Sequence, residues 1–317
     1  MDIGEVLVTS WKITWKNRIL WLFGLLIAFS QAVNLANNAF NIATQTNILP
    51  SSEMQNFGSY MDIRSPVFWV GLISIACGLM VFLLFLSSIG QIGIIKGVAL
   101  ADRSENAIPS RDELAKAIKH YFGRIFSFSL IQGFIFLAIF LFIYVVIIAL
   151  IMGSFVASRE SLAAGPVVLL ATICLIPFIC VFTVLASIMG AIITYATISM
   201  VNDDLGIWSG LTNSAHFLKK NFWRVFLLMI VNAALGGVIG FALALPISFT
   251  SFIPLMALTA PEIGTSAGWI GILCLLAYAP IFVFLQAIFS VYAHSVWTLS
   301  YRRLSMPPST LIEPVLG

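Results

Sequence analysis

The sequence predicts an all-α integral membrane protein with six transmembrane helices, arranged as three tandem helical hairpins that each follow a cytoplasmic amphipathic surface helix. Composition is the first observation: 60% of the 317 residues are hydrophobic, only 9% are charged and the mean hydropathy is +1.04, far from soluble globular domains. Long apolar runs that recur along the chain are the second observation. Cationic residues that gather at alternate ends of these runs are the third.

Six mostly apolar runs are long enough to cross the ~30 Å hydrocarbon layer as helices, which rise about 1.5 Å per residue. Their approximate limits are 18–35, 66–95, 125–155, 165–199, 223–248 and 267–299. If all six cross, every lysine and arginine except Arg64 and Arg159 falls on one side of the membrane. Cationic loops stay in the cytoplasm, so we expect both termini to be cytoplasmic.

A basic amphipathic segment precedes the first, third and fifth runs. Apolar residues recur there at helical spacing, as Ile3, Leu7, Trp11 and Trp15 do, and we expect each segment to lie at the membrane surface. Before the third run, the pattern Ser110-Arg-Asp-Glu113 predicts a helix start with a capping box. Six lysines of these segments are expected to contact anionic lipid headgroups: Lys12, Lys16, Lys116, Lys119, Lys219 and Lys220.

Landmarks that return after about one hundred residues predict an internal repeat. Lys16-Asn17 matches Lys220-Asn221, and Asn17-Arg18 matches Gly123-Arg124. We expect a single six-span membrane domain over 1–303, with repeat units of about 1–102, 103–203 and 204–303 and an irregular cytoplasmic tail over 304–317. The second span of each unit carries a residue that weakens or kinks a helix, and these candidate hinges are Gly78, Pro177 and Pro280.

The interiors of the runs hold no Asp, Glu, Lys or Arg, which argues against a proton-coupled pump or a carrier of strongly charged solutes. His120, His216 and His294 lack metal-ligand spacing, and the four cysteines form no C-x-x-C pair. Nucleophile-elbow and phosphate-loop motifs are also missing. We therefore expect no cofactor, no metal site and no catalytic residue. Basic residues flank the spans, so lipid is a better partner than nucleic acid.

Polar residues within the spans have two interpretations. Interhelical hydrogen bonds of typically ~0.6 kcal/mol are the favoured one, and the lining of a polar cavity is the other. The residues in question are Gln31, Gln91, Gln132, Asn232 and Gln286. Small residues four apart predict close helix packing, either within the bundle or in a homo-oligomer; these pairs are Gly24 and Ala28, Gly93 and Gly97, Ala186 and Gly190, and Gly236 and Gly240.

The segment from Trp15 to Leu26, WKNRILWLFGLL, together with the basic helices before the third and fifth spans, resembles a loose group of uncharacterised prokaryotic polytopic membrane proteins. That group is similar to the membrane domain attached to some glycerophosphodiester phosphodiesterases. The resemblance covers most of the chain and implies a helical domain, without an assigned activity, in the cytoplasmic (inner or plasma) membrane of a prokaryote. The catalytic domain of those enzymes has no counterpart here, so their activity is not carried over.

Taken together, the sequence favours a non-enzymatic polytopic membrane protein that acts as a scaffold, accessory subunit or membrane-organising factor. Its expected partners are membrane lipids with anionic headgroups, and either further copies of the chain or another membrane protein. The alternative is a transporter or channel for a neutral or lipid-like solute. A lipid-modifying enzyme would instead require Asp102, Asp112, Glu113 and His120 to converge in one cleft.

Overall fold

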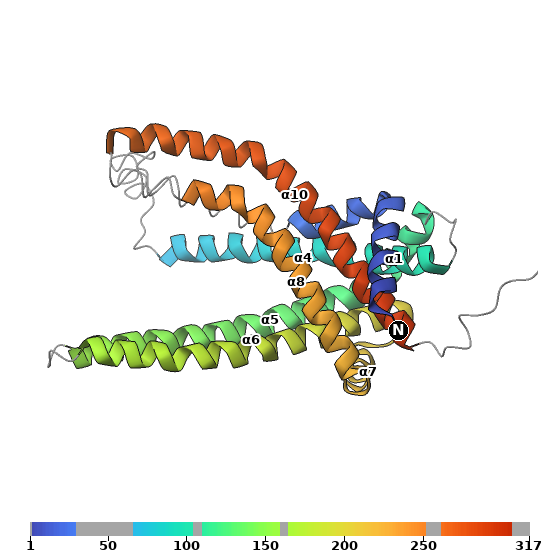
Figure 1. Ribbon diagram of the computed structural model, residues 1–317, viewed down its shortest axis with the longest axis horizontal. Coiled ribbons are helices and arrows are strands. Elements are labelled where there is room, and N and C mark those ends of the chain that lie inside the picture. Colours follow the sequence, from blue (N-terminus) through green and yellow to red (C-terminus); the bar gives the residue numbers. More distant parts are fainter. Residues whose placement is uncertain (1, 30–65, 104–109, 159–163, 252–260, 306–317) are drawn as a thin grey trace, which may run out of the picture. The chain divides into compact units, whose positions relative to one another are not determined.

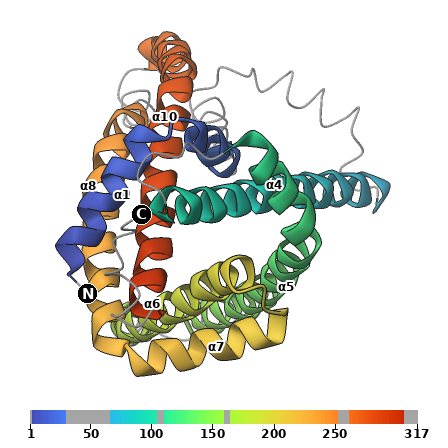
Figure 2. The same cartoon turned by 90° about the vertical axis from the view of Figure 1, so that its right-hand side faces the viewer.

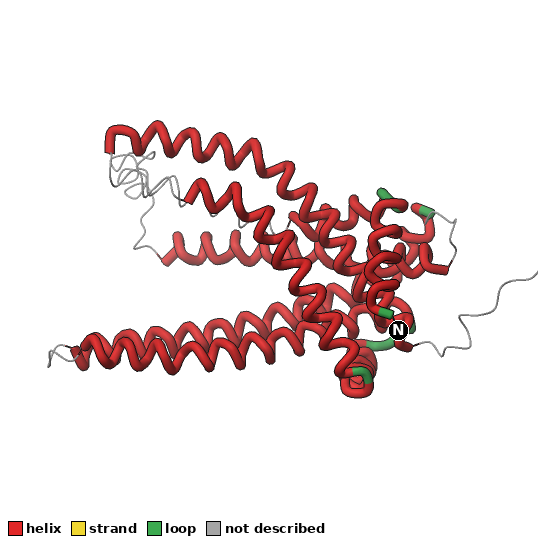
Figure 3. Tube along the Cα trace, in the orientation of Figure 1, coloured by secondary structure: helices red, strands yellow, loops and turns green. Residues whose placement is uncertain are grey.

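The computed structural model describes residues 2–29, 66–103, 110–158, 164–251 and 261–305. Within these ranges every regular element is a helix, as Figure 3 shows. The labelled helices of Figure 1 are α1 (Ile3–Lys16), α4 (Pro66–Arg103), α5 (Arg111–Ser158), α6 (Ala164–Asn202), α7 (Ile207–Lys220), α8 (Phe222–Ser251) and α10 (Pro261–Ser305). A further helix over Ile19–Phe29 follows α1.

Five of the described helices contain segments long and apolar enough to cross a membrane, and these confirm the all-α membrane class. The segments are Cys77–Arg103, Arg111–Val145, Val181–Asn202, Phe222–Pro246 and Leu273–Ser305. The first predicted span, 18–35, is represented by the shorter apolar helix Ile19–Phe29. Its remaining residues lie outside the described part of the chain, so the count of six spans stays a prediction.

The chain divides into two compact units. Unit 1 comprises Met1–Phe122 and Asn221–Gly317, and unit 2 comprises Gly123–Lys220. Unit 1 therefore joins the two ends of the sequence, while unit 2 holds most of α5 together with α6 and α7. The predicted threefold repeat follows other boundaries and stays a prediction.

In unit 1, α10 is the helix on which the others pack. It contacts α1, α4 and α8, and Figure 2 shows α1 lying alongside it. Apolar side chains from all four helices and from Ile19–Phe29 meet in one core, whose burial follows from the preference of apolar groups for close packing. The core residues are Val6, Ile13, Leu20, Ile27, Ile94, Val98, Leu228, Val291, Tyr292, Val296 and Leu299.

Glycines allow three helices of unit 1 to approach closely. A Cβ atom added at Gly24 would overlap the carbonyl oxygen of Ala287 in α10, and one added at Gly93 would overlap the ring of Phe23. A Cβ atom added at Gly97 would overlap the side chain of Leu20. Small residues at helix contacts permit such approach because no side chain separates the backbones.

Charged side chains join the ends of α4 and α10 in unit 1. Nη1 of Arg302 lies 2.7 Å from Oδ2 of Asp102, and the same nitrogen donates to the carbonyl oxygen of Ala99 at 2.8 Å. Arg303 lies 3.5 Å from both Asp102 and Glu5, so this cluster also reaches α1. Asp102 is thus bound by two arginines.

The predicted helix start at Ser110 is present: the amide of Glu113 donates to Oγ of Ser110 at 3.2 Å. Downstream, α5 continues through Gly123 without a break, whereas helices end at the matching positions Asn17 and Asn221. The side-chain amide of Asn17 donates to the carbonyl of Ile13, and asparagine competes with helical backbone bonds in this way. Gly123 has no side chain to do so.

The face that α1 buries differs from its aromatic stripe. Val6, Ser10, Ile13 and Thr14 are buried, and the two hydroxyls bond to carbonyls one turn earlier in the same helix. The ring of Trp15 contacts those of Trp11 and Trp21 edge to face, although Trp11 and Trp15 remain about half exposed. The stripe therefore presents aromatic surface outward, next to the buried face.

Candidate functional site

A groove of about 670 Å³ runs between α5, α6 and α7 within unit 2. Its volume falls in the range of sites that hold small-molecule ligands. The groove is lined by Arg124, Phe128, Ile131, Gln132, Ile135, Phe136, Ile139, Phe182, Leu185, Ala186, Met189, Ile193, Ile207, Trp208 and Leu211. Apart from Arg124, Gln132 and the indole nitrogen of Trp208, these side chains offer only apolar surface.

Helical periodicity places these residues on one face of each long helix. The α5 wall repeats at steps of three and four from Arg124 to Ile139, and the α6 wall does the same from Phe182 to Ile193, as residues on one helix face must. The α5 wall spans sixteen residues, or fifteen steps of about 1.5 Å, and so measures about 22 Å. One leaflet of the hydrocarbon layer is only about 15 Å thick, so the groove is long enough to take a lipid chain.

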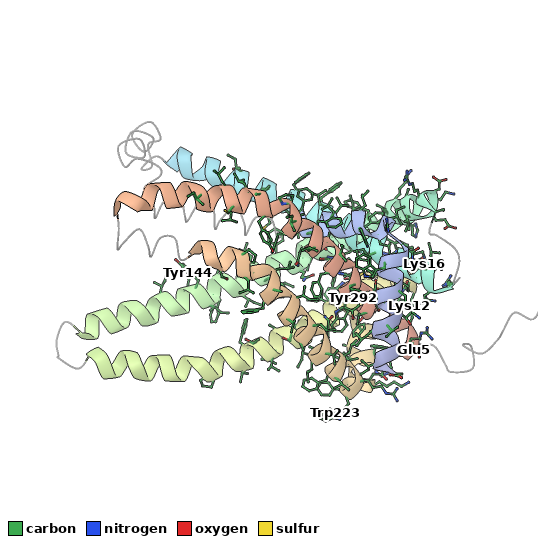
Figure 4. The ribbon with its side chains drawn as sticks, turned by 45° about the horizontal axis from the view of Figure 1, so that its top comes forward. Glu5, Lys12, Lys16, Tyr144, Trp223 and Tyr292 are labelled. Atoms are coloured by element: carbon green, nitrogen blue, oxygen red, sulfur yellow. The ribbon has the colours of Figure 1, made fainter. Side chains whose placement is uncertain are left out.

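At the end of the groove beside α7, packed side chains form its base. Phe128, Ala196 and Met200 are buried together, and Ile193, Ile207 and Leu211 pack against them. Farther along, the walls are open: Ile135 is 54% exposed and Leu185 is 57% exposed. In Figure 4, α5 and α6 form the two long arms of this unit. The groove is therefore accessible from the side, where membrane lipid would surround it.

Arg124 lies where the groove meets the connection between α6 and α7, and we call this end the mouth. Its Nη1 lies 2.9 Å from Oδ1 of Asp204 and donates, also at 2.9 Å, to the carbonyl oxygen of Leu205. The side chains of Arg124 and Asp204 are 34% and 58% exposed. Trp208, at 78% exposed, stands beside this pair.

The backbone of Asp204 is in the left-handed region, with φ of 54°. Aspartate and asparagine tolerate this region better than other residues with side chains. Asp204 follows the end of α6, and α7 begins at Ile207. Acidic residues such as Asp203 and Asp204 suit the start of a helix, but both lie before the first residue of α7. Asp204 instead reverses the chain between two helices and holds its carboxylate against Arg124.

Of the polar residues singled out in the sequence, one lines the groove. Gln132 lies in the α5 wall, two turns beyond Arg124.

The other predicted polar residues that the structure describes lie outside the groove lining. Gln91 donates to Oγ of Ser87 at 3.3 Å within α4, and Gln286 is half-buried in α10. Oδ1 of Asn232 is buried without a hydrogen-bond partner among the described residues. Gln31 lies outside the described residues.

The candidate hinges lie within helices. Gly78 is in α4, Pro177 is in α6 and Pro280 is in α10, and all three are exposed. Their role as hinges stays a prediction. Pro246 is a further proline inside a described helix, α8.

All six lysines predicted to contact headgroups are exposed, and Figure 4 shows Lys12 and Lys16 following one another along α1.

Three of the four residues that a lipid-modifying enzyme would require, Asp102, Glu113 and His120, make local structural contacts. Asp102 is engaged by Arg302 and Arg303, and Glu113 bonds through its amide to the helix cap. The ring of His120 contacts that of Tyr121 edge to face. Within the described ranges, no three of the His, Cys, Asp and Glu side chains are grouped so that they could hold a metal ion.

The groove itself was missed in the sequence. Apolar residues on the α5 and α6 walls look the same as residues that face lipid or a neighbouring helix. A usable signal was Arg124 at the start of the third span, followed by Phe128 and Gln132 at intervals of four. Close helix packing is predicted for the pair Ala186 and Gly190, but Ala186 lines the groove. An added Cβ at Gly190 would meet no atom of the described part of the chain within 4 Å, apart from its own helix backbone.

The described helices and the groove define a helical multi-pass membrane protein with an apolar site that opens sideways. The chain belongs to the family of a domain of unknown function, DUF7847, whose model matches residues 1–304. No curated protein and no solved structure matches the chain. The resemblance to the membrane domain of glycerophosphodiester phosphodiesterases stays a prediction.

Proposed function

We propose that this protein is a non-enzymatic, membrane-organising protein that holds the hydrocarbon chain of a membrane lipid in the groove of unit 2. The observation that carries the proposal is the groove itself: a face about 22 Å long, apolar along its walls, with an arginine at one end. Burying apolar surface contributes roughly 25 cal/mol per Å². A chain inserted between the two walls contacts both of them.

The surrounding architecture supports a role at the membrane surface. We propose six spans with both termini in the cytoplasm and the protein in the cytoplasmic membrane of a prokaryote. In this arrangement α1, the beginning of α5 and α7 lie along the inner surface, where their exposed lysines meet anionic headgroups. The exposed rings of Trp11 and Trp15 beside Lys12 and Lys16 suit the headgroup region. Other copies of the chain or another membrane protein are further proposed partners.

Two substitutions on α6 test the groove. Ala186→Phe adds a ring to a small residue that lines the groove, whereas Val184→Phe adds one to a residue outside the lining, which is 55% exposed. The purified variants are delipidated, incubated with a phospholipid mixture and examined by native mass spectrometry. We expect Ala186→Phe to lose the bound lipid and Val184→Phe to keep it. Equal retention by both variants and the unchanged protein would rule out the groove as the site.

The alternative function is a carrier for a neutral or lipid-like solute. One observation favours it: Gln132 places an amide about 12 Å along α5 from Arg124, so a polar headgroup has a second contact inside the groove. Movement of a fluorescent phospholipid between leaflets of proteoliposomes separates the two functions. A carrier accelerates this movement and loses the acceleration with Gln132→Leu. A protein that only holds lipid leaves the rate unchanged.

A further inference from the structure

The charges at the mouth of the groove are of both signs. Arg124 supplies one positive charge, Asp204 pairs with it at 2.9 Å, and Asp203 is the exposed neighbour of Asp204. Lys219 and Lys220, the nearest cations along α7, begin twelve residues beyond Ile207, which is about 18 Å along the helix. Lys119, five residues before Arg124 in α5, is also exposed. The two cations Arg124 and Lys119 then balance Asp203 and Asp204, so the mouth has no excess of positive charge that would attract a purely anionic headgroup.

Arg124 retains unused hydrogen-bonding capacity. Among the described residues, both of the bonds that it donates start from Nη1. A guanidinium carries five N–H groups in a fixed plane, and it binds phosphate through paired donors. Nη2 and Nε are thus available to a phosphate that approaches from the exposed side, without breaking the bonds to Asp204 and Leu205.

Asp204 offers the complementary charge next to that phosphate position. The bond from Arg124 uses Oδ1 of this carboxylate. More than half of this side chain is exposed. The left-handed backbone of Asp204 fixes the carboxylate at the turn between α6 and α7. An ammonium group linked to a phosphate on Arg124 would reach it.

We propose that the mouth of the groove recognises a zwitterionic aminophospholipid, with the lipid phosphate on Arg124 and the primary ammonium on Asp204. The assignment rests on the proposed function, because the hydrocarbon chain of the same lipid occupies the groove. Each charge of the headgroup then lies next to a side chain of opposite charge: the phosphate next to Arg124 and the ammonium next to Asp204. Anionic lipids remain the partners of the lysines on the surface helices.

Competition between lipids tests the proposal. The delipidated protein is incubated with equal amounts of phosphatidylethanolamine, phosphatidylglycerol and phosphatidylcholine of identical chains, and the bound lipids are counted by native mass spectrometry. We expect phosphatidylethanolamine to be retained about three- to tenfold over the other two, the ratio that one charge-assisted hydrogen bond supplies at a partly exposed site. Phosphatidylcholine carries the same charges without N–H donors, so it isolates that bond.

Substitutions at the mouth assign the preference to its residues. Asp204→Asn preserves the tolerance for the left-handed backbone and removes the charge, so we expect the preference for phosphatidylethanolamine to disappear while total lipid retention persists. Asp203→Asn makes the same change of charge on the neighbouring residue and should keep the preference. Arg124→Gln should weaken retention of all three phospholipids, and Arg124→Lys should restore part of it.

The outcomes separate this proposal from the one on which it rests. If Ala186→Phe abolishes retention but the unchanged protein holds all three phospholipids equally, the groove binds lipid and the headgroup assignment is wrong. A preference for phosphatidylglycerol, or one that survives Asp204→Asn, also overturns the assignment. If Ala186→Phe retains lipid as the unchanged protein does, the groove is not the lipid site and both proposals fail.

Discussion

Nη1 of Arg302 lies 2.7 Å from Oδ2 of Asp102, and the two side chains are only 9% and 12% exposed. Two hundred residues of sequence separate these partners, yet the pair fastens the end of α10 to the end of α4 within unit 1. Arg302 also bonds to the carbonyl of Ala99. A buried ion pair adds little net stability when it is intact, but removing one partner leaves the other charge buried alone.

The first prediction concerns this pair. Asp102→Asn should lower the free energy of unfolding by about 3 kcal/mol, because Arg302 stays buried without its countercharge. Glu5→Gln is the control: Glu5 lies 3.5 Å from Arg303 and is 60% exposed, so its loss should cost less than about 1 kcal/mol. The measurement is denaturant-induced unfolding in detergent micelles. Equal losses for the two variants would show that the buried pair does not hold these helices together.

The second prediction concerns helix contact at Gly24. A methyl group there would meet the carbonyl oxygen of Ala287 and the side chain of Val291, so Gly24→Ala should destabilise unit 1 by about 1–3 kcal/mol. Gly78→Ala is the matched control in the same unit, because an added Cβ at Gly78 meets no atom of the described residues within 4 Å, apart from its own helix backbone. Alanine also favours a helix over glycine by up to about 1 kcal/mol. Thermal unfolding that ranks the two variants in the opposite order would contradict this packing.

Hydropathy predicted much of the fold because the relevant physics is local. A run of apolar residues must become a helix in lipid, since its backbone groups have no other partners, and Ser110 caps α5 through a bond only three residues long. The break at Asn17 and the continuity at Gly123 could also have been anticipated from side chains alone. Each of these features depends on residues within one or two turns.

The groove and the ion pair could not be predicted in the same way. Ile135 and Leu185 are as apolar as core residues, and only the spacing between α5 and α6 decides that they line a groove. Arg302 and Asp102 carry no pattern that pairs them across the sequence. The sequence does not reveal the left-handed backbone of Asp204, because acidic residues are also common at helix starts. Packing between distant segments determines all of these features.

The third prediction tests the proposed topology. In a cysteine-free background, single cysteines at Lys12, Lys116 and Lys219 should react with a membrane-impermeant maleimide only when the cytoplasmic side is accessible. A cysteine at Arg64 should react from the other side. The reason is the retention of cationic segments in the cytoplasm, and all three lysine positions are exposed. Labelling of Lys12 and Lys219 positions from opposite sides would overturn the six-span arrangement.

The fourth prediction separates packing from cavity lining at Asn232. Its Oδ1 is buried and has no partner among the described residues, and an unsatisfied amide group costs about 1–3 kcal/mol. Asn232→Leu should therefore leave stability unchanged or raise it, as judged by thermal unfolding. Gln91→Leu, which removes a bond to Ser87, should lower stability by about 0.6 kcal/mol. A clear loss with Asn232→Leu would instead mean that Asn232 is satisfied from outside these residues, by a second copy of the chain or by a solute. Loss of an oligomer in cross-linking would identify the second copy, because a solute contact leaves the oligomeric state as it was.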